Sequence, residues 1–255
     1  MFGSGRLREG SHLPEAKDPY VLDNVEVVDD FSAFGVQAFT TTRAFGTFGA
    51  GGADPISDVL GRWDAVIAHA ASHGVGRLAT AKQVHGASVL VHASGWEGWL
   101  RATEADGHAV IARGTALAVT VADCVPVFLA HPSGAVALLH SGWRGTAARI
   151  VEQGIAALEH RGCRASELRL HLGPAICGRC YEVSADVYRR LTGQTVAAPR
   201  VVDLRALIAA HARERGVQHI TISERCTRHD NARFFSHRAG DAGRQIAMLF
   251  AVPLP

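Results

Sequence analysis

The sequence lacks an uninterrupted apolar run that is long enough to cross a membrane. Its longest apolar stretch, residues 116–130, contains the charged residue Asp123, whereas a membrane-spanning helix needs about 20 consecutive, mostly apolar residues. Residues 1–17 also lack the apolar core of a secretory signal. We therefore expect a protein without a membrane partner.

The chain also lacks an excess of charge of either sign. Its 26 Lys and Arg residues nearly balance its 24 Asp and Glu residues, which leaves a formal net charge of +2. Proteins that bind nucleic acid through bulk charge are strongly basic, so we expect no nucleic-acid partner. The apolar share of 47% and the charged share of 20% are typical of globular proteins and exclude a mainly disordered chain.

Cysteine is scarce, and its five residues follow no disulfide-scaffold spacing. This usage is typical of a reducing compartment and predicts a cytoplasmic protein. Cys177 and Cys180 form a CxxC pair that has no second CxxC to match it. We interpret this pair as two incidental thiols in a loop, with a redox-active pair or half of a zinc ribbon as alternatives. Cys163 and Cys226 belong to no recognisable pattern.

Apolar periodicity predicts a mixture of strands and helices without strict alternation. We expect an N-terminal tail and lead-in at residues 1–30 and a single mixed α/β domain at residues 31–255. Helices are expected at 57–73, capped by Ser57, from the segment 141–146 to Leu158, and at 184–192 and 203–215. Strands are expected near 36–42, 77–85, 87–93, 107–113, 116–122, up to Ala130, and at 135–139, 168–172 and 217–222, with extended pieces at 234–238 and 245–252.

Three polar residues stand where predicted strands end, namely His85, Cys124 and His140. Two His and one Cys with one position left open match a catalytic zinc site, and imidazole and thiolate donors suit zinc or copper. One alternative is a buried core cysteine with two hydrogen-bonded histidines. Another is a nucleophile pair of Cys124 and His140. The spacing alone leaves these alternatives open.

A glycine-containing loop at 141–146 follows His140 directly and opens a predicted helix. Free backbone N–H groups at a helix start, together with the guanidinium of Arg144, suit a phosphate or another oxyanion. The alternative is an ordinary strand-to-helix turn in which Arg144 pairs with an acid. Asp123, beside Cys124, is a candidate to orient a ligand or contact a ribose hydroxyl, with a turn-forming carboxylate as the alternative.

Several short motifs, taken together, resemble one protein family. They are Gln83-Val84-His85-Gly86, Ala122-Asp123-Cys124-Val125-Pro126, His140-Ser141-Gly142-Trp143-Arg144-Gly145, Leu172-Gly173-Pro174-Ala175-Ile176, Ser236-His237-Arg238 and Ala242-Gly243-Arg244. In this order they resemble the laccase-domain (multicopper polyphenol oxidase) family, now understood as zinc-dependent purine nucleoside phosphorylases. The similarity covers roughly residues 33–250.

The resemblance implies a fold, a cofactor and an activity. The fold would be a layered α/β domain with central mixed β-sheets flanked by helices. The cofactor would be zinc, with copper as the alternative, and the matching ligands are His85, Cys124 and His140. The reaction would be phosphorolysis of adenosine, inosine, guanosine or methylthioadenosine to a purine base and a pentose 1-phosphate, together with adenosine deaminase activity. Purine nucleosides and phosphate are the implied partners, and a monomer is favoured.

The resemblance also implies roles for single residues. Arg43, Arg62 and Arg144 would position the phosphate, while Asp123 would hold a sugar hydroxyl or move a proton. The segment 49–55 is rich in Gly and Ala and departs from the family pattern.

Three other functions stay open at this point. A cysteine hydrolase would use Cys124 and His140 as nucleophile and base. A copper-dependent polyphenol oxidase is a second option, although a single cluster of two His and one Cys cannot build the several linked copper centres of a true laccase. The altered segment 49–55 suggests the third, an inactive nucleoside-binding homologue.

Overall fold

The computed structural model describes residues 22, 24–49 and 54–254. Their strands form two six-stranded mixed sheets and one two-stranded sheet. Most of the expected tail and lead-in lies outside the described residues, and its described end contains strand β1 (Val25–Val27). No helix in the described part is both long and apolar enough to cross a membrane.

The first sheet has the strand order β1-β2-β14-β7-β3-β5. Besides β1, its strands are β2 (Val36–Thr41), β14 (Gln245–Ala251), β7 (Thr115–Val121), β3 (Arg77–Ala81) and β5 (Gly98–Ala102). The pairs from β1 to β7 are antiparallel, whereas β3 runs parallel to both β7 and β5. Nearly every residue of β7 and β14 is buried, which explains why both strands have almost continuous apolar sequences.

The second sheet has the order β13-β10-β8-β9-β6-β4. Its strands are β13 (His219–Ile222), β10 (Arg169–Leu172), β8 (Val125–Ala130), β9 (Val136–Ser141), β6 (Gly107–Val110) and β4 (Val89–His92). The two outer pairs are parallel and the inner pairs antiparallel. A separate hairpin-like pair joins β11 (Glu182–Val183) to β12 (Arg200–Val201).

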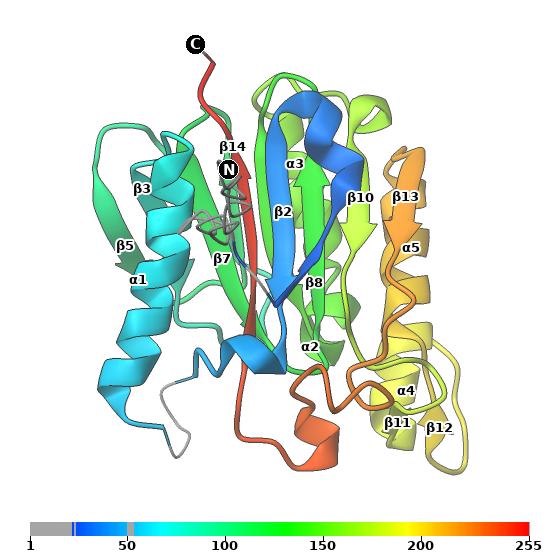
Figure 1. The fold of residues 1–255 in the computed structure, drawn as a ribbon. Helices are drawn as coiled ribbons and strands as arrows, with labels where there is room; N and C mark the ends of the chain where they lie inside the picture. Colours follow the sequence, from blue (N-terminus) through cyan, green and yellow to red (C-terminus); the bar gives the residue numbers. More distant parts are fainter. Residues whose placement is uncertain (1–21, 23, 50–53, 255) are drawn as a thin grey trace, which may run out of the picture.

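Helices cover the outer faces of the two sheets. They are α1 (Ile56–Ser72), α2 (Trp143–Ala147), α3 (Ile150–Glu159), α4 (Ala185–Thr192) and α5 (Leu204–Glu214), with short 3-10 helices at Asp29–Phe34, Arg43–Phe45, Ala165–Glu167 and His237–Ala239. In Figure 1, α1 in cyan and α5 in yellow to orange lie on opposite sides of the molecule.

Three apolar clusters hold these layers together. Leu117 and Leu249 of the first sheet pack with Leu138 of the second, so an apolar core shared by both sheets lies between them. Helix α1 packs on the other face of the first sheet, and α3 and α5 pack on the other face of the second. The order of layers is therefore helix, sheet, sheet, helix. The expected mixed α/β class with layered mixed sheets flanked by helices is confirmed.

Most expected elements are present, but the structure corrects several details. The helix expected after Ser57 starts at Ile56, because Ser57 Oγ donates to Asp58 and Pro55 occupies the N-cap position. The long helix expected to run to Leu158 is two helices, because Arg149 adopts a left-handed backbone with φ of 57°. Strand β5 was not expected, since its residues are mostly exposed and carry no apolar alternation.

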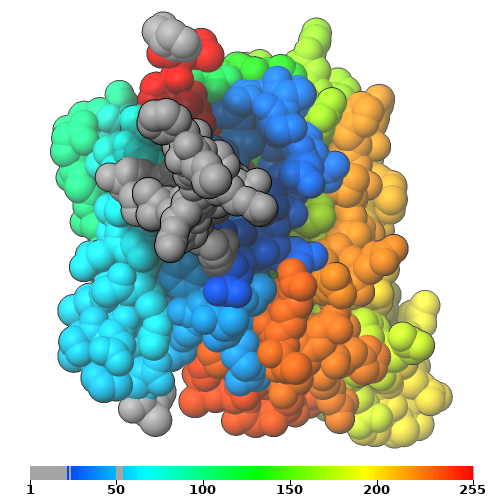
Figure 2. Space-filling model, viewed as in Figure 1, coloured from blue at the N-terminus to red at the C-terminus, as the bar shows by residue number. Residues whose placement is uncertain are grey.

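The segment 234–238, expected to be extended, leads into the 3-10 helix His237–Ala239. It belongs to a long C-terminal loop that lies against the residues 43–49, as Figure 2 shows at the lower edge of the molecule. Backbone N–H groups of Arg43 and Phe48 donate to the carbonyl oxygens of Arg233 and Arg244 at 2.7 and 2.8 Å. These backbone hydrogen bonds therefore join the two loops into one continuous layer.

Candidate functional site

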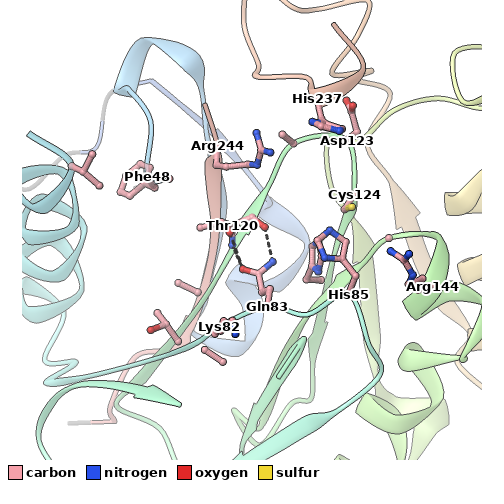
Figure 3. A pocket seen from close by; sticks show the side chains of 18 of the residues that line it. Phe48, Lys82, Gln83, His85, Thr120, Asp123, Cys124, Arg144, His237 and Arg244 are labelled. Carbon is pink, nitrogen blue, oxygen red and sulfur yellow. Dashed lines mark hydrogen bonds between the residues drawn. The ribbon is translucent and has the colours of Figure 1, made fainter. Parts of the chain in front are cut away.

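Three crossings of the chain from the first sheet to the second meet near one cavity. They are the links from β3 to β4, from β5 to β6 and from β7 to β8. The cavity has a volume of about 720 Å³, which is within the usual range for small-molecule sites. The functional side chains on its wall, several of them labelled in Figure 3, include Phe48, Trp63, Lys82, Gln83, His85, Trp99, Arg101, Thr120, Asp123, Cys124, His140, Arg144, Tyr181, His237, Arg238 and Arg244.

The structure brings the three expected metal donors together at this cavity. We call His85, Cys124 and His140 the His85 cluster, and their ligand atoms lie within 4.8 Å of one another. His85 lies in the turn after β3 with φ of 60°, and Cys124 follows Asp123, whose φ is 81°. His140 is the penultimate residue of β9. Two turns with left-handed residues and one strand end thus direct the donors to a common point.

The buried carboxylate of Asp106 holds the His85 cluster in place through hydrogen bonds. The backbone N–H groups of Val84, His85 and Gly86 donate to its two oxygens at 3.2, 2.9 and 2.6 Å. His140 Nδ1 donates to Asp106 Oδ1 at 2.8 Å, which leaves Nε2 of His140 as its free ligand atom. A carboxylate that fixes the tautomer of a ligating histidine is common in zinc sites.

Electrostatics favour a thiolate at Cys124. Burial raises the pKa of Cys124, but the charge of His140 and hydrogen bonds from His140 and His85 outweigh it and lower that pKa. Burial alone would lower the pKa of His140, but the Cys124 thiolate and the Asp106 hydrogen bond outweigh burial and raise that pKa. Burial alone would raise the pKa of Asp106, but the hydrogen bonds from His140 and Gly86 outweigh burial and lower that pKa. Because metal ligands bind in their deprotonated form, the site favours the ionised form of the thiol that a metal requires.

Arg144 is the cavity cation that is best placed to bind an anion. It is the second residue of α2, two positions after the N-cap residue Gly142, and its guanidinium stacks over the ring of Trp143 at 4.6 Å. Among the described residues it makes no ion pair with a carboxylate. By contrast, Arg238 and Arg244 donate to the backbone carbonyl oxygens of neighbouring residues. The acid partner that the alternative of an ordinary turn requires for Arg144 is not found among the described residues.

The two other expected phosphate contacts, Arg43 and Arg62, are not among the described residues that line the cavity. Arg43 forms an ion pair with Asp241 at 2.5 Å and stacks on Phe235 at 4.5 Å. Arg62 forms an ion pair with Asp54 at 2.7 Å and donates to the carbonyl oxygen of Thr47 at 2.9 Å. Both guanidinium groups hold loops together, so direct phosphate contact by them stays a prediction that the geometry does not support.

Asp123 lines the cavity but is held by protein groups on both of its oxygens. Thr227 Oγ1 donates to Oδ1 at 2.6 Å, and the backbone N–H of Arg238 donates to Oδ2 at 2.7 Å. The carboxylate is 8% exposed. Its expected contact with a sugar hydroxyl stays a prediction, whereas its visible contacts join the turn before Cys124 to the C-terminal loop.

The end of the cavity away from the His85 cluster is aromatic. The rings of Trp63 and Trp99 lie 4.8 Å apart, and Phe48 meets Trp63 edge to face at 5.2 Å. Figure 3 shows Phe48 across the cavity from Cys124, with Gln83 and Thr120 between them. Gln83 is fixed there by three hydrogen bonds to Thr120. Flat apolar walls of this kind suit an aromatic ring such as a nucleobase.

The structure places the CxxC pair, interpreted above as incidental thiols, in a larger group of possible metal ligands. Cys177 and Cys180 lie beside Cys226 and His229, and the four ligand atoms are within 4.8 Å of one another. The signal that sequence reasoning missed is the CxxH spacing of Cys226 and His229, which mirrors the CxxC spacing. Asp106 was missed as well, and no spacing in the sequence would have found it.

Comparisons with known proteins agree with these findings. A family model described as "Multi-copper polyphenol oxidoreductase laccase" matches residues 48–251. A protein named purine nucleoside phosphorylase from Streptomyces coelicolor is 36% identical over 170 residues, which cover 64% of this chain and 69% of that protein. A protein of the same name from Mycobacterium tuberculosis is 34% identical over 233 residues, covering 84% of this chain and 92% of that protein.

Two solved structures have the same fold over most of the chain. A Neisseria meningitidis protein of the DUF152 family has a TM-score of 0.78 at 26% identity and covers 91% of this chain and 100% of that chain. YlmD from Geobacillus stearothermophilus has a TM-score of 0.78 at 27% identity, covering 87% of this chain and 94% of that chain.

Proposed function

The chain belongs to the multi-copper polyphenol oxidoreductase laccase family, and from this premise we propose that it is a zinc-dependent purine nucleoside phosphorylase. Its substrates would be phosphate and adenosine, inosine, guanosine or methylthioadenosine. The names of its relatives support the reaction class. The single observation that carries the proposal is one cavity that joins the His85 cluster, an aromatic wall and Arg144, which has no carboxylate partner among the described residues.

The His85 cluster fits a zinc ion in number and type of ligand. Two imidazoles and one thiolate are typical zinc donors, and three protein ligands leave one position open, as in catalytic sites. A zinc ion bound there would supply Lewis-acid chemistry to an oxygen or nitrogen atom of a substrate. Asp106 would keep His140 in the correct tautomer, because its carboxylate accepts the Nδ1 proton.

Phosphorolysis breaks the bond between the sugar anomeric carbon and the purine nitrogen and forms a new bond to a phosphate oxygen. Arg144 would bind the phosphate and balance its charge, because its guanidinium reaches the cavity and pairs with no carboxylate in the described part of the chain. The aromatic wall of Phe48, Trp63 and Trp99 would orient the purine. Holding the two reactants in one cavity supplies much of the rate enhancement.

The test combines metal analysis with an assay for purine release that depends on phosphate. We expect the purified chain to contain zinc and to release base from at least one of the four nucleosides. Cys124→Ala should lose the metal of the His85 cluster. Its kcat/KM should fall by at least about 100-fold, because stabilisation of the transition state by a metal ion is worth several kcal/mol. Cys163→Ala is the matched control, since Cys163 is buried outside both metal-ligand groups. Full turnover by Cys124→Ala without metal contradicts the proposal.

Arg144 is tested in the same assay. Arg144→Ala should raise the KM for phosphate and lower kcat/KM by about 100-fold, a loss expected when one charged transition-state contact is removed. Arg161→Ala, an exposed arginine away from the cavity, should leave both parameters unchanged. A nucleoside that binds without release of base in the wild-type chain would instead identify an inactive homologue. Release of ammonia from adenosine without phosphate would reveal the deaminase activity.

A cysteine hydrolase is the second candidate, because Asp106, His140 and Cys124 form the acid, base and nucleophile series of such enzymes. The presence of His85 beside the thiol favours metal binding, since a triad of Asp106, His140 and Cys124 needs no second histidine. The two candidates respond differently to inhibitors. A chelator abolishes activity in the phosphorylase and leaves a cysteine hydrolase active.

A further inference from the structure

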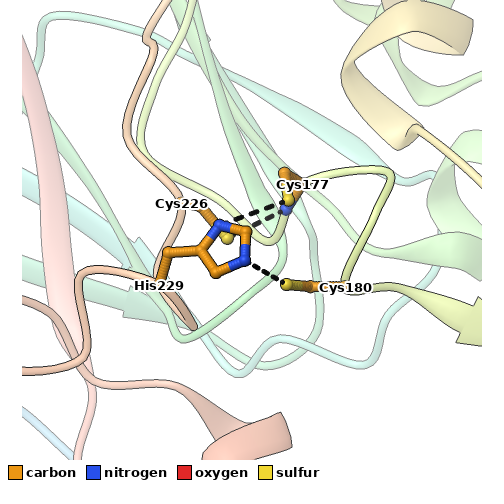
Figure 4. A group of neighbouring side chains, drawn as sticks. All are labelled: Cys177, Cys180, Cys226 and His229. Carbon is orange, nitrogen blue, oxygen red and sulfur yellow. Dashed lines mark hydrogen bonds between the residues drawn. The ribbon is translucent and has the colours of Figure 1, made fainter.

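A second group of metal-ligand side chains lies outside the cavity. We call Cys177, Cys180, Cys226 and His229 the Cys226 cluster, and Figure 4 shows that the imidazole ring lies among the three sulfurs. His229 Nε2 is 3.1 Å from Cys180 Sγ, and Nδ1 is 3.8 Å from Cys177 Sγ. The first two residues follow β10 and the last two follow β13, so the cluster joins distant parts of the chain.

Two tight turns present these side chains. The backbone N–H groups of Cys180 and Tyr181 both donate to the carbonyl oxygen of Cys177, at 2.9 and 3.1 Å, so the thiols of the CxxC pair point to the same side. The N–H of Asp230 donates to the carbonyl oxygen of Cys226 at 2.8 Å, which places His229 one turn beyond Cys226. Both turns therefore contain a hydrogen bond from the fourth residue after the first cysteine back to its carbonyl oxygen, and their ligand atoms lie within 4.8 Å of one another.

Backbone contacts lock the two turns together. A parallel bridge pairs Ala175 with Cys226, and the N–H of Thr227 donates to the carbonyl oxygen of Ala175 at 3.2 Å. The N–H of Cys177 donates to the sulfur of Cys226 at 3.3 Å. Hydrogen bonds from neighbouring groups to ligand atoms are usual in metal sites, because they orient the donor. The framework thus holds the four donors in position through its own contacts.

We propose that the Cys226 cluster is a second metal site of this chain, which holds a structural zinc ion with four protein ligands. Three thiolates and one imidazole with CxxC and CxxH spacing are a donor set of structural zinc sites. A tetrahedral ion with zinc–sulfur bonds of about 2.3 Å needs donors about 3.8 Å apart, and the described atoms lie within 4.8 Å. The set is closed, since it leaves no position for a substrate.

A buried group of thiols without a metal is the plain alternative. Cys180 and Cys226 are 8% and 4% exposed and contact the apolar side chain of Ile176. That alternative does not account for the position of His229, an exposed residue whose Nε2 lies 3.1 Å from Cys180 Sγ, within the group of three sulfurs. A polar ring that can reach water gains little from contact with neutral thiols, whereas it gains much as a zinc ligand.

The second ion would stabilise the wall of the cavity. Ile176 and Tyr181 flank the CxxC pair, and both line the cavity. Arg238 donates to the carbonyl oxygen of Cys180, and Thr227 beside Cys226 donates to Asp123. Because these residues lead from the Cys226 cluster to the turn before Cys124, an ion in the cluster would hold the wall in its substrate-binding position without contacting substrate.

The test is the zinc content of the full chain and of variants of either cluster. We expect two zinc ions per wild-type chain, one in Cys124→Ala and one in Cys226→Ser. Cys163→Ser is the matched control and should keep two ions, because Cys163 is buried elsewhere. The proposal is overturned if Cys226→Ser holds as much zinc as Cys163→Ser. The zinc content of Cys124→Ala is measured without an activity assay, so this test of the Cys226 cluster does not depend on the proposed phosphorylase activity.

A second measurement guards against a variant that fails to fold. The Cys124→Ala chain is loaded with cobalt, a spectroscopic substitute for zinc, and should show strong thiolate-to-cobalt charge transfer from the three remaining sulfur ligands. Adding His229→Asn, a change at an exposed side chain, should weaken cobalt binding by at least tenfold and shift the ligand-field bands. Absence of charge transfer in the folded Cys124→Ala chain overturns the proposal.

Discussion

Asp106 shows how one buried side chain can determine the geometry of a site without contacting a substrate. Its two oxygens accept hydrogen bonds from three consecutive backbone N–H groups and from His140. These contacts fix the left-handed turn at His85 and the tautomer of His140 at the same time. Two of the three donors of the His85 cluster therefore depend on one carboxylate.

We predict that Asp106→Asn lowers the metal affinity of the His85 cluster by about 10- to 100-fold, the usual cost of losing a carboxylate that hydrogen-bonds to a metal ligand. An amide offers only one acceptor oxygen, and its NH2 group opposes the surrounding N–H donors. The measurement is competitive titration with a zinc chelator. Asp64→Asn, an exposed position on α1, is the matched control. Equal zinc affinity in Asp106→Asn and Asp64→Asn would show that the carboxylate is dispensable.

Single residues also show what the sequence could predict about the site. His85, Cys124, His140 and Arg144 were recognisable because they belong to contiguous motifs or follow strongly apolar strands. Asp106 was not, since its role depends on contacts with the turn at His85 and with His140, which no local pattern encodes. The contacts of Arg43 and Arg62 were likewise hidden, because their carboxylate partners are set by the path of loops.

At the scale of elements, the start of α2 approaches the His85 cluster closely. Gly142 is the N-cap residue of α2, and its φ of −83° is one that any residue can adopt. A Cβ atom at this position would lie 2.9 Å from Cys124 Sγ and 3.5 Å from the His85 ring. Glycine is therefore required here for space and not for backbone freedom.

We predict that Gly142→Ala weakens metal binding by at least about tenfold, because the added methyl group must displace the Cys124 sulfur. The protein should remain folded, since the backbone conformation suits alanine. Gly61→Ala on α1 is the contrasting variant, because a Cβ there meets open space and removing a helical glycine stabilises by about 0.5–1 kcal/mol. Metal content and thermal unfolding are measured for both. Wild-type zinc affinity in Gly142→Ala would refute the steric argument.

Elements with strong local signals were predicted well. Ser184 and Asp203 cap α4 and α5 as expected, with their side chains accepting from Val187 and Ala206. The break between α2 and α3 was missed, because the apolar face continues across Arg149 while the backbone does not. Whether a continuous apolar pattern belongs to one helix or two depends on tertiary packing, which sequence periodicity alone cannot show.

At the scale of the whole molecule, the site results from the topology of the two sheets. Each crossing from the first sheet to the second contributes to it: the link after β3 carries His85, the link after β5 ends at Asp106, and the link after β7 carries Cys124. The sequence predicted most of the strands, with β5 missed, but not which sheet each one joins. The assignment of strands to sheets is set by long-range pairing, so the convergence of these links could be seen only in the structure.

The second sheet also contains a pair of histidines that makes global stability depend on pH. His108 in β6 is fully buried, and its Nδ1 lies 2.9 Å from Nε2 of His92 in β4. Burial, followed by the charge of His92, lowers the pKa of His108 to about 3, although the Asp106 carboxylate raises it. Burial also lowers the pKa of His92. The folded chain therefore resists protonation that the unfolded chain accepts near pH 6.5.

We predict that the free energy of unfolding falls as the pH decreases below about 6.5, because the unfolded state then binds a proton that the folded state excludes. For His108 alone the loss between about pH 7 and pH 5 is about 2 kcal/mol, since its folded pKa of about 3 lies below that window. His108→Gln removes this titration and should flatten the profile by that amount, as measured by denaturant unfolding. Metal release at low pH affects both proteins and cancels in the difference. Parallel pH profiles for His108→Gln and the wild-type chain would show that His108 does not titrate between the folded and unfolded states.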